Sequence, residues 1–102
     1  MSSRILYSPS AVQDLGDILD YISQDNPEAA ARVASEIREG IGLLAEYPLM
    51  GRRLKDRGFD EHRVLVFGNY LAFYVVAGEE VQIRRILHGA RRFEPLLEGP
   101  QP

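Results

Sequence analysis

The sequence has no cysteine and no tryptophan, and it contains only two histidines and two methionines in 102 residues. The lack of cysteine excludes disulfide bonds and thiolate metal sites, and it fits a reducing compartment such as the cytoplasm. No apolar run approaches the roughly 20 residues that cross a bilayer, and the first residues are too few and too polar for a secretory signal. We therefore expect a cytoplasmic protein without a membrane partner.

The usual signatures of cofactor and hydrolase sites are also absent. The chain has no GxGxxG or GxxxxGK[ST] loop, and none of its serines lies in a GxSxG turn. His62 and His88 are too far apart in sequence for their spacing to indicate a pair of metal ligands. We expect no cofactor and no metal.

The net charge is small, but acidic and basic residues are unevenly distributed along the chain. The net charge is −3, yet residues 1–50 hold three arginines against eight acidic residues, whereas residues 51–102 hold nine basic residues against seven acidic ones. Basic residues cluster at 52–57, at Arg84-Arg85 and at Arg91-Arg92. Such clusters steer towards anionic partners, or are simply solvated surface. The acidic whole argues against direct sequence-specific binding of nucleic acid.

Length and composition indicate one domain. A chain of 102 residues with 45% hydrophobic and 26% charged residues is typical of a single globular unit. We assign residues 1–97 to this domain. Residues 98–102 end in Gly-Pro-Gln-Pro, and we expect them to form a frayed tail.

The first half of the chain predicts a strand and two helices. Residues 4–7 are β-prone, and Ser8-Pro9 supplies a capping residue followed by a proline at the first helical position. Asn26-Pro27 repeats this start signal, and Pro48 stops the second helix at about residue 47. The short turn between the helices makes them antiparallel neighbours. The first helix should bury Val12, Leu15, Leu19 and Ile22 and direct Asp14, Asp17 and Asp20 towards its other faces.

The second half predicts three strands, at residues 62–67, 70–76 and 80–88. Gly68-Asn69 is a strong signal for a tight hairpin, and residues 77–79 turn the chain again. The order β-α-α-β-β-β predicts an α+β domain in which an antiparallel helical hairpin packs on one face of a mostly antiparallel four-stranded sheet.

The strand at 70–76 is apolar at every position, which is typical of strands buried on both faces. Two helices cover only one face of a sheet. Because side chains alternate, Leu71, Phe73 and Val75 point one way, and Tyr70 and Tyr74 the other. One of these sets should lie near solvent and bind a partner protein, unless the tail at 93–97 folds back over it.

Cleavage of RNA without a metal would need proton-transfer groups and cations, for which the candidates are Arg63, Arg84, His88 and Arg91. Arg84 and Arg85 should point to opposite faces of the sheet unless a bulge intervenes, and one of them needs a carboxylate or carbonyl partner near the helices. We expect Arg63 on a strand next to them, forming a cationic strip. A strip of this kind binds anions without doing chemistry, and a packed or surface histidine is the commoner interpretation of His88.

Several stretches taken in order resemble the RelE/ParE toxin superfamily, over roughly residues 5 to 97. Residues 11–30 are similar to the helical hairpin of ParE-type toxins, in particular Ala11-Val12-Gln13-Asp14-Leu15 and Asn26-Pro27-Glu28-Ala29-Ala30. Leu44, Pro48 and Gly51 resemble the end of the family's second helix and the loop after it. The closing strands are represented by Arg63, Tyr70, Phe73-Tyr74 and the run from Val81 to Arg91.

The resemblance implies the toxin of a type II toxin–antitoxin module, with a ParD-like antitoxin as partner. RelE-like members cut messenger RNA on the ribosome, and their last strand runs into His/Lys-Arg with a tyrosine about four residues on. Here Gly89 follows His88, and the later aromatic residue is Phe93, which has no hydroxyl. These departures favour the ParE-like activity, which is inhibition of DNA gyrase without catalysis.

The resemblance leaves two alternatives to a gyrase inhibitor, a ribosome-dependent ribonuclease and a non-toxic binding module of the same fold. Arg52, Arg53 and Lys55 roughly match a region where the nucleases carry lysines. The antitoxin is expected to cover the leftover apolar surface, that is Tyr70, Leu71, Phe73, Tyr74 and Val75. The candidates for contact with the target are Arg63, Arg84, Arg85, Arg91, Arg92 and Phe93.

Overall fold

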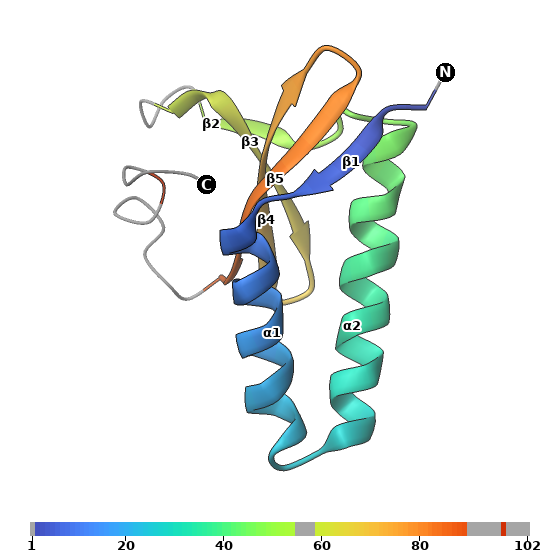
Figure 1. The fold of residues 1–102 in the computed structure, drawn as a ribbon, viewed down its shortest axis with the longest axis vertical. Coiled ribbons are helices and arrows are strands. Elements are labelled where there is room, and N and C mark those ends of the chain that lie inside the picture. The colour runs from blue at the N-terminus through green and yellow to red at the C-terminus, as the bar shows by residue number, and fades with distance from the viewer. Residues whose placement is uncertain (1, 55–58, 90–96, 98–102) are drawn as a thin grey trace.

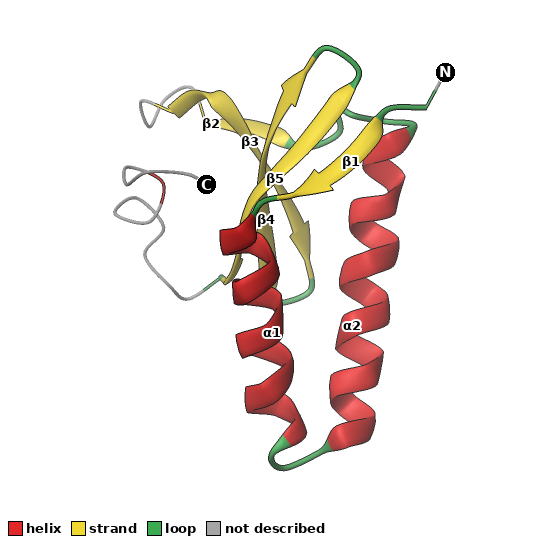
Figure 2. Cartoon of the chain, in the orientation of Figure 1, coloured by secondary structure: helices red, strands yellow, loops and turns green. Residues whose placement is uncertain are grey.

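The computed structural model describes residues 2–54, 59–89 and 97, and it confirms the predicted α+β order. A helical hairpin packs on one face of a sheet, with the helices extending well beyond the sheet's edge (Figures 1 and 2). The elements are β1 (Arg4–Tyr7), α1 (Pro9–Ser23), α2 (Pro27–Gly42), a 3-10 turn η1 (Leu43–Ala45), β2 (Arg52–Leu54), β3 (Phe59–Phe67), β4 (Tyr70–Ala77) and β5 (Glu80–His88).

The sheet is larger than predicted. It has five strands in the order β1-β5-β4-β3-β2, and β1 runs parallel to β5 while the other pairs are antiparallel. The prediction of four strands missed β2, because a three-residue strand inside a basic loop has no hydrophobic pattern of its own. The position of β1 also depends on pairing with residues far away in the chain, since Arg4 lies opposite Glu80.

Both predicted helix starts are confirmed. The Ser8 hydroxyl accepts a hydrogen bond from the Ala11 N–H at 3.0 Å, and the Asn26 side chain accepts one from the Ala29 N–H at 3.1 Å. Each cap satisfies one of the free N–H groups at a helix start and is worth about 1 kcal/mol. The start of each helix in the hairpin is therefore specified by residues next to it in the sequence.

The predicted buried face of α1 is partly wrong. Ala11 and Asp14 are the buried residues of this helix, whereas Val12 is 58% exposed. Leu15 and Ile18 pack against the core from the same side. The buried face of α1 is rotated towards Ala11 and Asp14, about one residue before the expected positions. The reason is that α1 begins beside the edge of β5, and Asp14 faces that edge.

The main core lies between the helices and the sheet. The alternation predicted for β4 is confirmed, because Ala72 and Tyr74 belong to this core while Phe73 belongs to a second cluster. Residues from both helices, from η1 and from strands β4 and β5 are fully buried there, namely Ala11, Ile37, Ile41, Leu44, Ala72, Tyr74, Val81, Ile83 and Ile86.

At three positions of the elements and turns the structure explains why the residue is glycine. Gly68 and Gly78 occupy the two hairpin turns with φ of 53° and 60°, a region that L residues with side chains rarely adopt. Among the described residues no other kind of residue has a positive φ, so Asn69 does not use the conformational freedom predicted for it. Gly40 of α2 lies against Phe67, whose ring atoms are 2.2 Å from the place where a Cβ would be.

Candidate functional site

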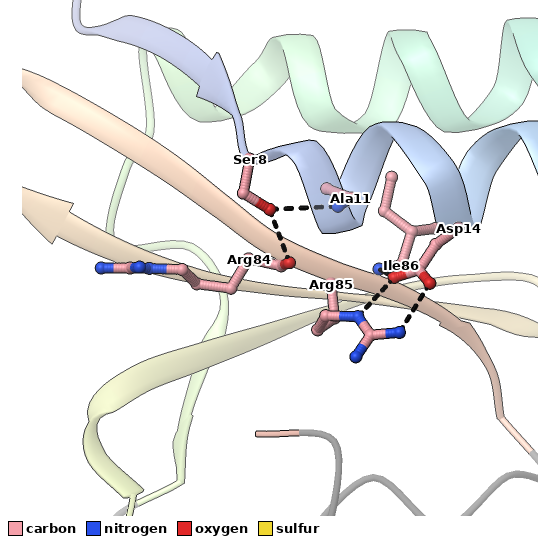
Figure 3. Close-up of polar contacts among 6 residues, drawn as sticks. All are labelled: Ser8, Ala11, Asp14, Arg84, Arg85 and Ile86. Atoms are coloured by element: carbon pink, nitrogen blue, oxygen red, sulfur yellow. Dashed lines mark hydrogen bonds and ion pairs between the residues drawn. The ribbon is translucent and has the colours of Figure 1, made fainter. Parts of the chain in front are cut away.

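Three of the candidate residues, Arg84, Arg85 and His88, lie on β5, and the edge of this strand changes partner half-way along. β1 pairs with β5 only as far as Ile83. Beyond that point the start of α1 supplies polar side chains to the strand edge, as Figure 3 shows. The Ser8 hydroxyl donates to the Arg84 carbonyl at 2.8 Å, and the Asp14 carboxylate accepts from the Ile86 N–H at 3.0 Å. Side chains of a helix thus replace the missing strand.

Arg85 completes this arrangement by forming a two-pronged ion pair with Asp14. Its Nε and Nη2 donate to the two carboxylate oxygens, each at 2.7 Å. The hydrogen bond to Asp14 raises the pKa of Arg85, while burial acts in the opposite direction. The prediction that Asp14 lies away from the core is wrong: only 8% of it is exposed, because its charge is matched by Arg85 and the Ile86 N–H.

Arg84 and Arg85 are separated by a bulge, the exception that the sequence left open. Phe73 lies opposite Arg85 and Tyr74 opposite Ile83, so Arg84 has no partner position on β4. Arg84 points away from α1 (Figure 3) and donates to the Gln82 side chain at 3.0 Å. It lies on the outer face of the sheet, defined here as the face opposite the helices.

Arg63 is not part of a strip with these arginines. The expectation that it lies on a strand next to Arg84 and Arg85 is wrong, because β4 separates β3 from β5. Arg63 lies opposite Tyr74, whose side chain is in the core on the helix side. Its Nη1 donates to the Leu49 carbonyl at 3.2 Å and to the Gly51 carbonyl at 2.9 Å. Arg63 therefore holds a loop in place.

His88 ends β5 in an exposed position. Its ring meets the Tyr70 ring edge-on, with centroids 5.5 Å apart and planes at 89°. A small hollow next to it is lined by Asp14, Asp17, Ile18, Ile86, Leu87 and His88. Arg91, Arg92 and Phe93 lie outside the described residues, as does the tail at 98–102.

The outer face of the sheet is largely covered by the chain itself. An outer cluster of Leu54, Val64, Phe73, Leu87 and Leu97 packs there, with Leu71 against it. Phe73 and Tyr74, two of the residues assigned to antitoxin binding, are both 0% exposed. The other three, Tyr70, Leu71 and Val75, are half-buried. Leu97 packs in this cluster, as expected if the tail folds back over the sheet, whereas residues 93–96 lie outside the described residues.

Sequence reasoning missed the segment with the most exposed apolar surface. Tyr47, Leu49 and Met50 are 58%, 63% and 44% exposed, and with Pro48 they line an open apolar hollow. The available signal was three large apolar side chains flanking a proline in a loop, where nothing in the secondary-structure pattern requires them.

The described residues offer no place for a metal or a membrane-spanning segment. No three side chains of His, Asp or Glu come together there in a way that would hold an ion. Within the same part of the chain no helix is both long and apolar enough to cross a bilayer.

Comparison with known proteins identifies the family. A family model described as the ParE toxin of the type II toxin–antitoxin system parDE matches residues 5–93. The chain belongs to the ParE toxin family. It is thus a toxin of the ParE/RelE kind, and the helical hairpin, the Asp14–Arg85 pair and the strand β5 all lie within the matched range.

Relatives and solved structures agree with this family. Toxin RelE2 of Caulobacter vibrioides is 38% identical over 89 residues, which are 87% of this chain and 98% of RelE2. Y4kP of Sinorhizobium fredii is 34% identical over 98 residues, covering 92% of this chain and 96% of that protein.

Among solved structures, a chain of the chromosomal ParDE system from P. aeruginosa superposes with a TM-score of 0.72. It is 26% identical, with 85% of this chain and 96% of that chain covered. A chain of the RelBE2 toxin–antitoxin complex from Mycobacterium tuberculosis has a TM-score of 0.62 at 22% identity, covering 86% and 99%, and this likeness concerns the fold alone.

Proposed function

We propose that this toxin inhibits DNA gyrase without being an enzyme, and that a ParD-like antitoxin neutralises it. One observation carries the proposal: the side chains that a ribonuclease of this fold would use are engaged in structural contacts or separated from one another. Arg63 is bonded to two loop carbonyls on the helix side of the sheet, whereas Arg84 lies on the outer face two strands away.

Metal-free cleavage of RNA needs an acid and a base on either side of one phosphate, with cations around it. His88 is exposed at the end of β5, and Arg63 is held at the loop on the other side of β4. Of the expected nuclease groups, the sequence also lacks the late tyrosine, since Phe93 has no hydroxyl to donate. This arrangement supports binding of a target rather than proton transfer.

The contact with the target uses the arginines of β5 and the residues that follow this strand. Arg84 is the member of this set that projects from the outer face, while Arg85 is already paired with Asp14. We include Arg91, Arg92 and Phe93 in the same proposed contact because they directly follow β5 in the sequence. The positive charge of these arginines suits an acidic or phosphate-bearing surface of the target.

A ribosome-dependent ribonuclease is the second candidate. It is favoured by the relative at 38% identity, which is named RelE2, and by the basic run at 52–57. In this reading Arg63, Arg84, His88 and Arg91 would surround the phosphate. A non-toxic binding module of the same fold is the remaining alternative.

Parallel assays of the purified toxin separate these functions. We expect inhibition of gyrase supercoiling together with stabilised gyrase-dependent DNA cleavage, and no cleavage of ribosome-bound messenger RNA. Arg84→Glu should weaken the inhibition, whereas Arg32→Glu, on the exposed surface of α2, should leave it unchanged. Messenger cleavage in the absence of any effect on gyrase would refute the proposal, and inactivity in both assays would favour the binding module.

The antitoxin part of the proposal has its own test. The two solved structures with a similar fold come from a ParDE system and a RelBE2 toxin–antitoxin complex. We expect that producing this chain alone arrests growth, and that co-expression of the open reading frame next to its gene relieves the arrest. Equal growth with and without that neighbour would argue against an antitoxin partner.

A further inference from the structure

The loop between α2 and β2 presents large apolar side chains to solvent. We call residues 47–50 the apolar loop. Tyr47, Leu49 and Met50 are all more than two-fifths exposed, and Leu43, one helical turn before Tyr47, is 52% exposed. The Tyr47 N–H donates to the Leu43 carbonyl at 2.9 Å, which fixes this spacing. Residues 47–50 line one open apolar hollow, and an exposed apolar surface of this kind marks a protein contact.

The backbone of the apolar loop is held by two side chains from the sheet, Tyr74 of β4 and Arg63 of β3. The Tyr74 hydroxyl donates to the Pro48 carbonyl and accepts from the Gly51 N–H, each at 2.8 Å. Arg63 donates to the Leu49 and Gly51 carbonyls. There is no room for another residue at position 51, because a Cβ there would lie 2.6 Å from the Tyr74 hydroxyl oxygen.

This fixation has a consequence for binding. A loop whose backbone is bonded at residues 48, 49 and 51 loses little conformational freedom when a partner covers it, so less of the contact energy is spent on ordering. The exposed side chains of Leu49 and Met50 take no part in the fixation, because only backbone atoms of this segment are bonded. The side chains of Leu49 and Met50 are therefore exposed on a backbone that is preorganised for binding.

The charge next to the apolar loop indicates the chemistry of the partner. Arg52 and Arg53 follow immediately and are exposed, and residues 52–57 hold four basic residues and one acidic residue. A second copy of this chain fits poorly, because a two-fold contact through the loop would bring the Arg52 side chains together. An acidic amphipathic segment fits both the apolar and the basic parts.

We infer that the apolar loop, with Leu43 and Arg52, is the docking site for an acidic amphipathic segment of the antitoxin; this inference rests on the proposed function. The sheet surface first expected to bind the antitoxin is mostly filled by the chain's own Leu54 and Leu97. The apolar loop remains open. The antitoxin is the partner that has to cover an exposed apolar surface for as long as the toxin is held inactive.

The test uses the full-length toxin and, as the probe, the purified product of the open reading frame next to its gene. Leu49→Asp should weaken the complex by about tenfold or more, because it places a charge in the centre of the apolar contact. Arg52→Glu should weaken it less and reduce its dependence on salt. The matched control is Val12→Asp on α1, since Val12 is 58% exposed; it should change the affinity less than twofold.

Two further measurements keep the result unambiguous. Unchanged circular dichroism and an unfolding temperature close to that of the unaltered protein establish that each variant folds. Inhibition of gyrase by each variant is read in the same experiment, and failure of the unaltered toxin in that assay would count against the proposed target without affecting the binding data. Leu49→Asp that binds the antitoxin as tightly as the unaltered protein overturns the inference. Loss of gyrase inhibition with intact antitoxin binding also overturns it, because the loop then serves the target.

Discussion

The hydroxyl of Tyr74 lies in the core and bonds two backbone groups of the loop after α2. Burial raises the pKa of Tyr74, while its bond from Gly51 and the charge of Arg63 act in the opposite direction. The neutral hydroxyl can donate to the Pro48 carbonyl and accept from the Gly51 N–H at once, which an ionised tyrosine cannot do. A residue of β4 thereby fixes, together with Arg63, the shape of a loop that comes earlier in the chain.

Tyr74→Phe should lower the free energy of unfolding by about 1–3 kcal/mol, because it leaves the Gly51 N–H without its partner. Urea denaturation measures this change. Tyr47→Phe is the control, since Tyr47 is 58% exposed and a surface change of this kind stays within about 0.5 kcal/mol. Equal stability of the two variants would mean that the hydroxyl does not hold the loop.

His62 gives a prediction about pH. Its pKa is lowered, first by burial and then by the charge of Arg84, while Glu61 raises it. The unfolded chain therefore takes up a proton on His62 at a higher pH than the folded chain, and stability falls as the pH drops below the ordinary value of about 6.5. We expect the urea midpoint to fall between pH 7 and pH 5.5, and to fall less in His62→Gln. The same decrease in both proteins would exclude His62 as its source.

At the scale of elements, α1 both covers the sheet and completes the edge of β5. Ser8 is at the same time the helix cap and a donor to the Arg84 carbonyl, and Asp14 accepts from Ile86. The sequence predicted Ser8 as a cap from its neighbour Pro9, but hydrophobic period alone placed Asp14 on the wrong side of the helix. The bulge at Arg84 decides this, because it brings Arg85 and the Ile86 N–H to the carboxylate.

The two helices contain glycines that should respond differently to substitution. A Cβ added at Gly16 would meet no neighbouring atom within 4 Å, whereas Gly40 packs against Phe67. Gly16→Ala should therefore raise the free energy of unfolding by up to about 1 kcal/mol. Gly40→Ala should give no such gain, since the Phe67 ring must first move. Chemical denaturation of both variants checks this, and an equal gain in both would show that the contact with Phe67 is not limiting.

At the scale of the whole molecule, the outer face is covered by segments that are distant in sequence. Leu54 of β2 and Leu97 near the C-terminus meet Phe73 and Leu87 of the two central strands. The expectation of a large uncovered sheet surface arose because two helices were counted as the only cover. Apolar side chains remain exposed on the apolar loop and at single positions elsewhere, such as Val66 of β3.

Leu97→Ala should lower the free energy of unfolding by about 2 kcal/mol, because Leu97 is only 5% exposed and truncation of a buried leucine costs about that much or more. It should also increase binding of a hydrophobic dye, since Phe73 loses part of its cover. Leu6→Ala is the control, because Leu6 is 43% exposed on β1. Equal stability of Leu97→Ala and the unaltered protein would show that the tail does not seal the sheet.

Local signals in the sequence determined the helix starts at Ser8 and Asn26, the hairpin at Gly68 and the alternation of β4, because each depends on residues within a few positions of one another. The tertiary structure alone decided the partners of Asp14, Arg63 and Tyr74, and the sealing of Phe73 by Leu97. For the polar side chains, these contacts join residues between 12 and 72 positions apart. Hydrophobic periodicity cannot predict contacts between residues so far apart, because these contacts depend on which strands become neighbours and on where a bulge shifts their register.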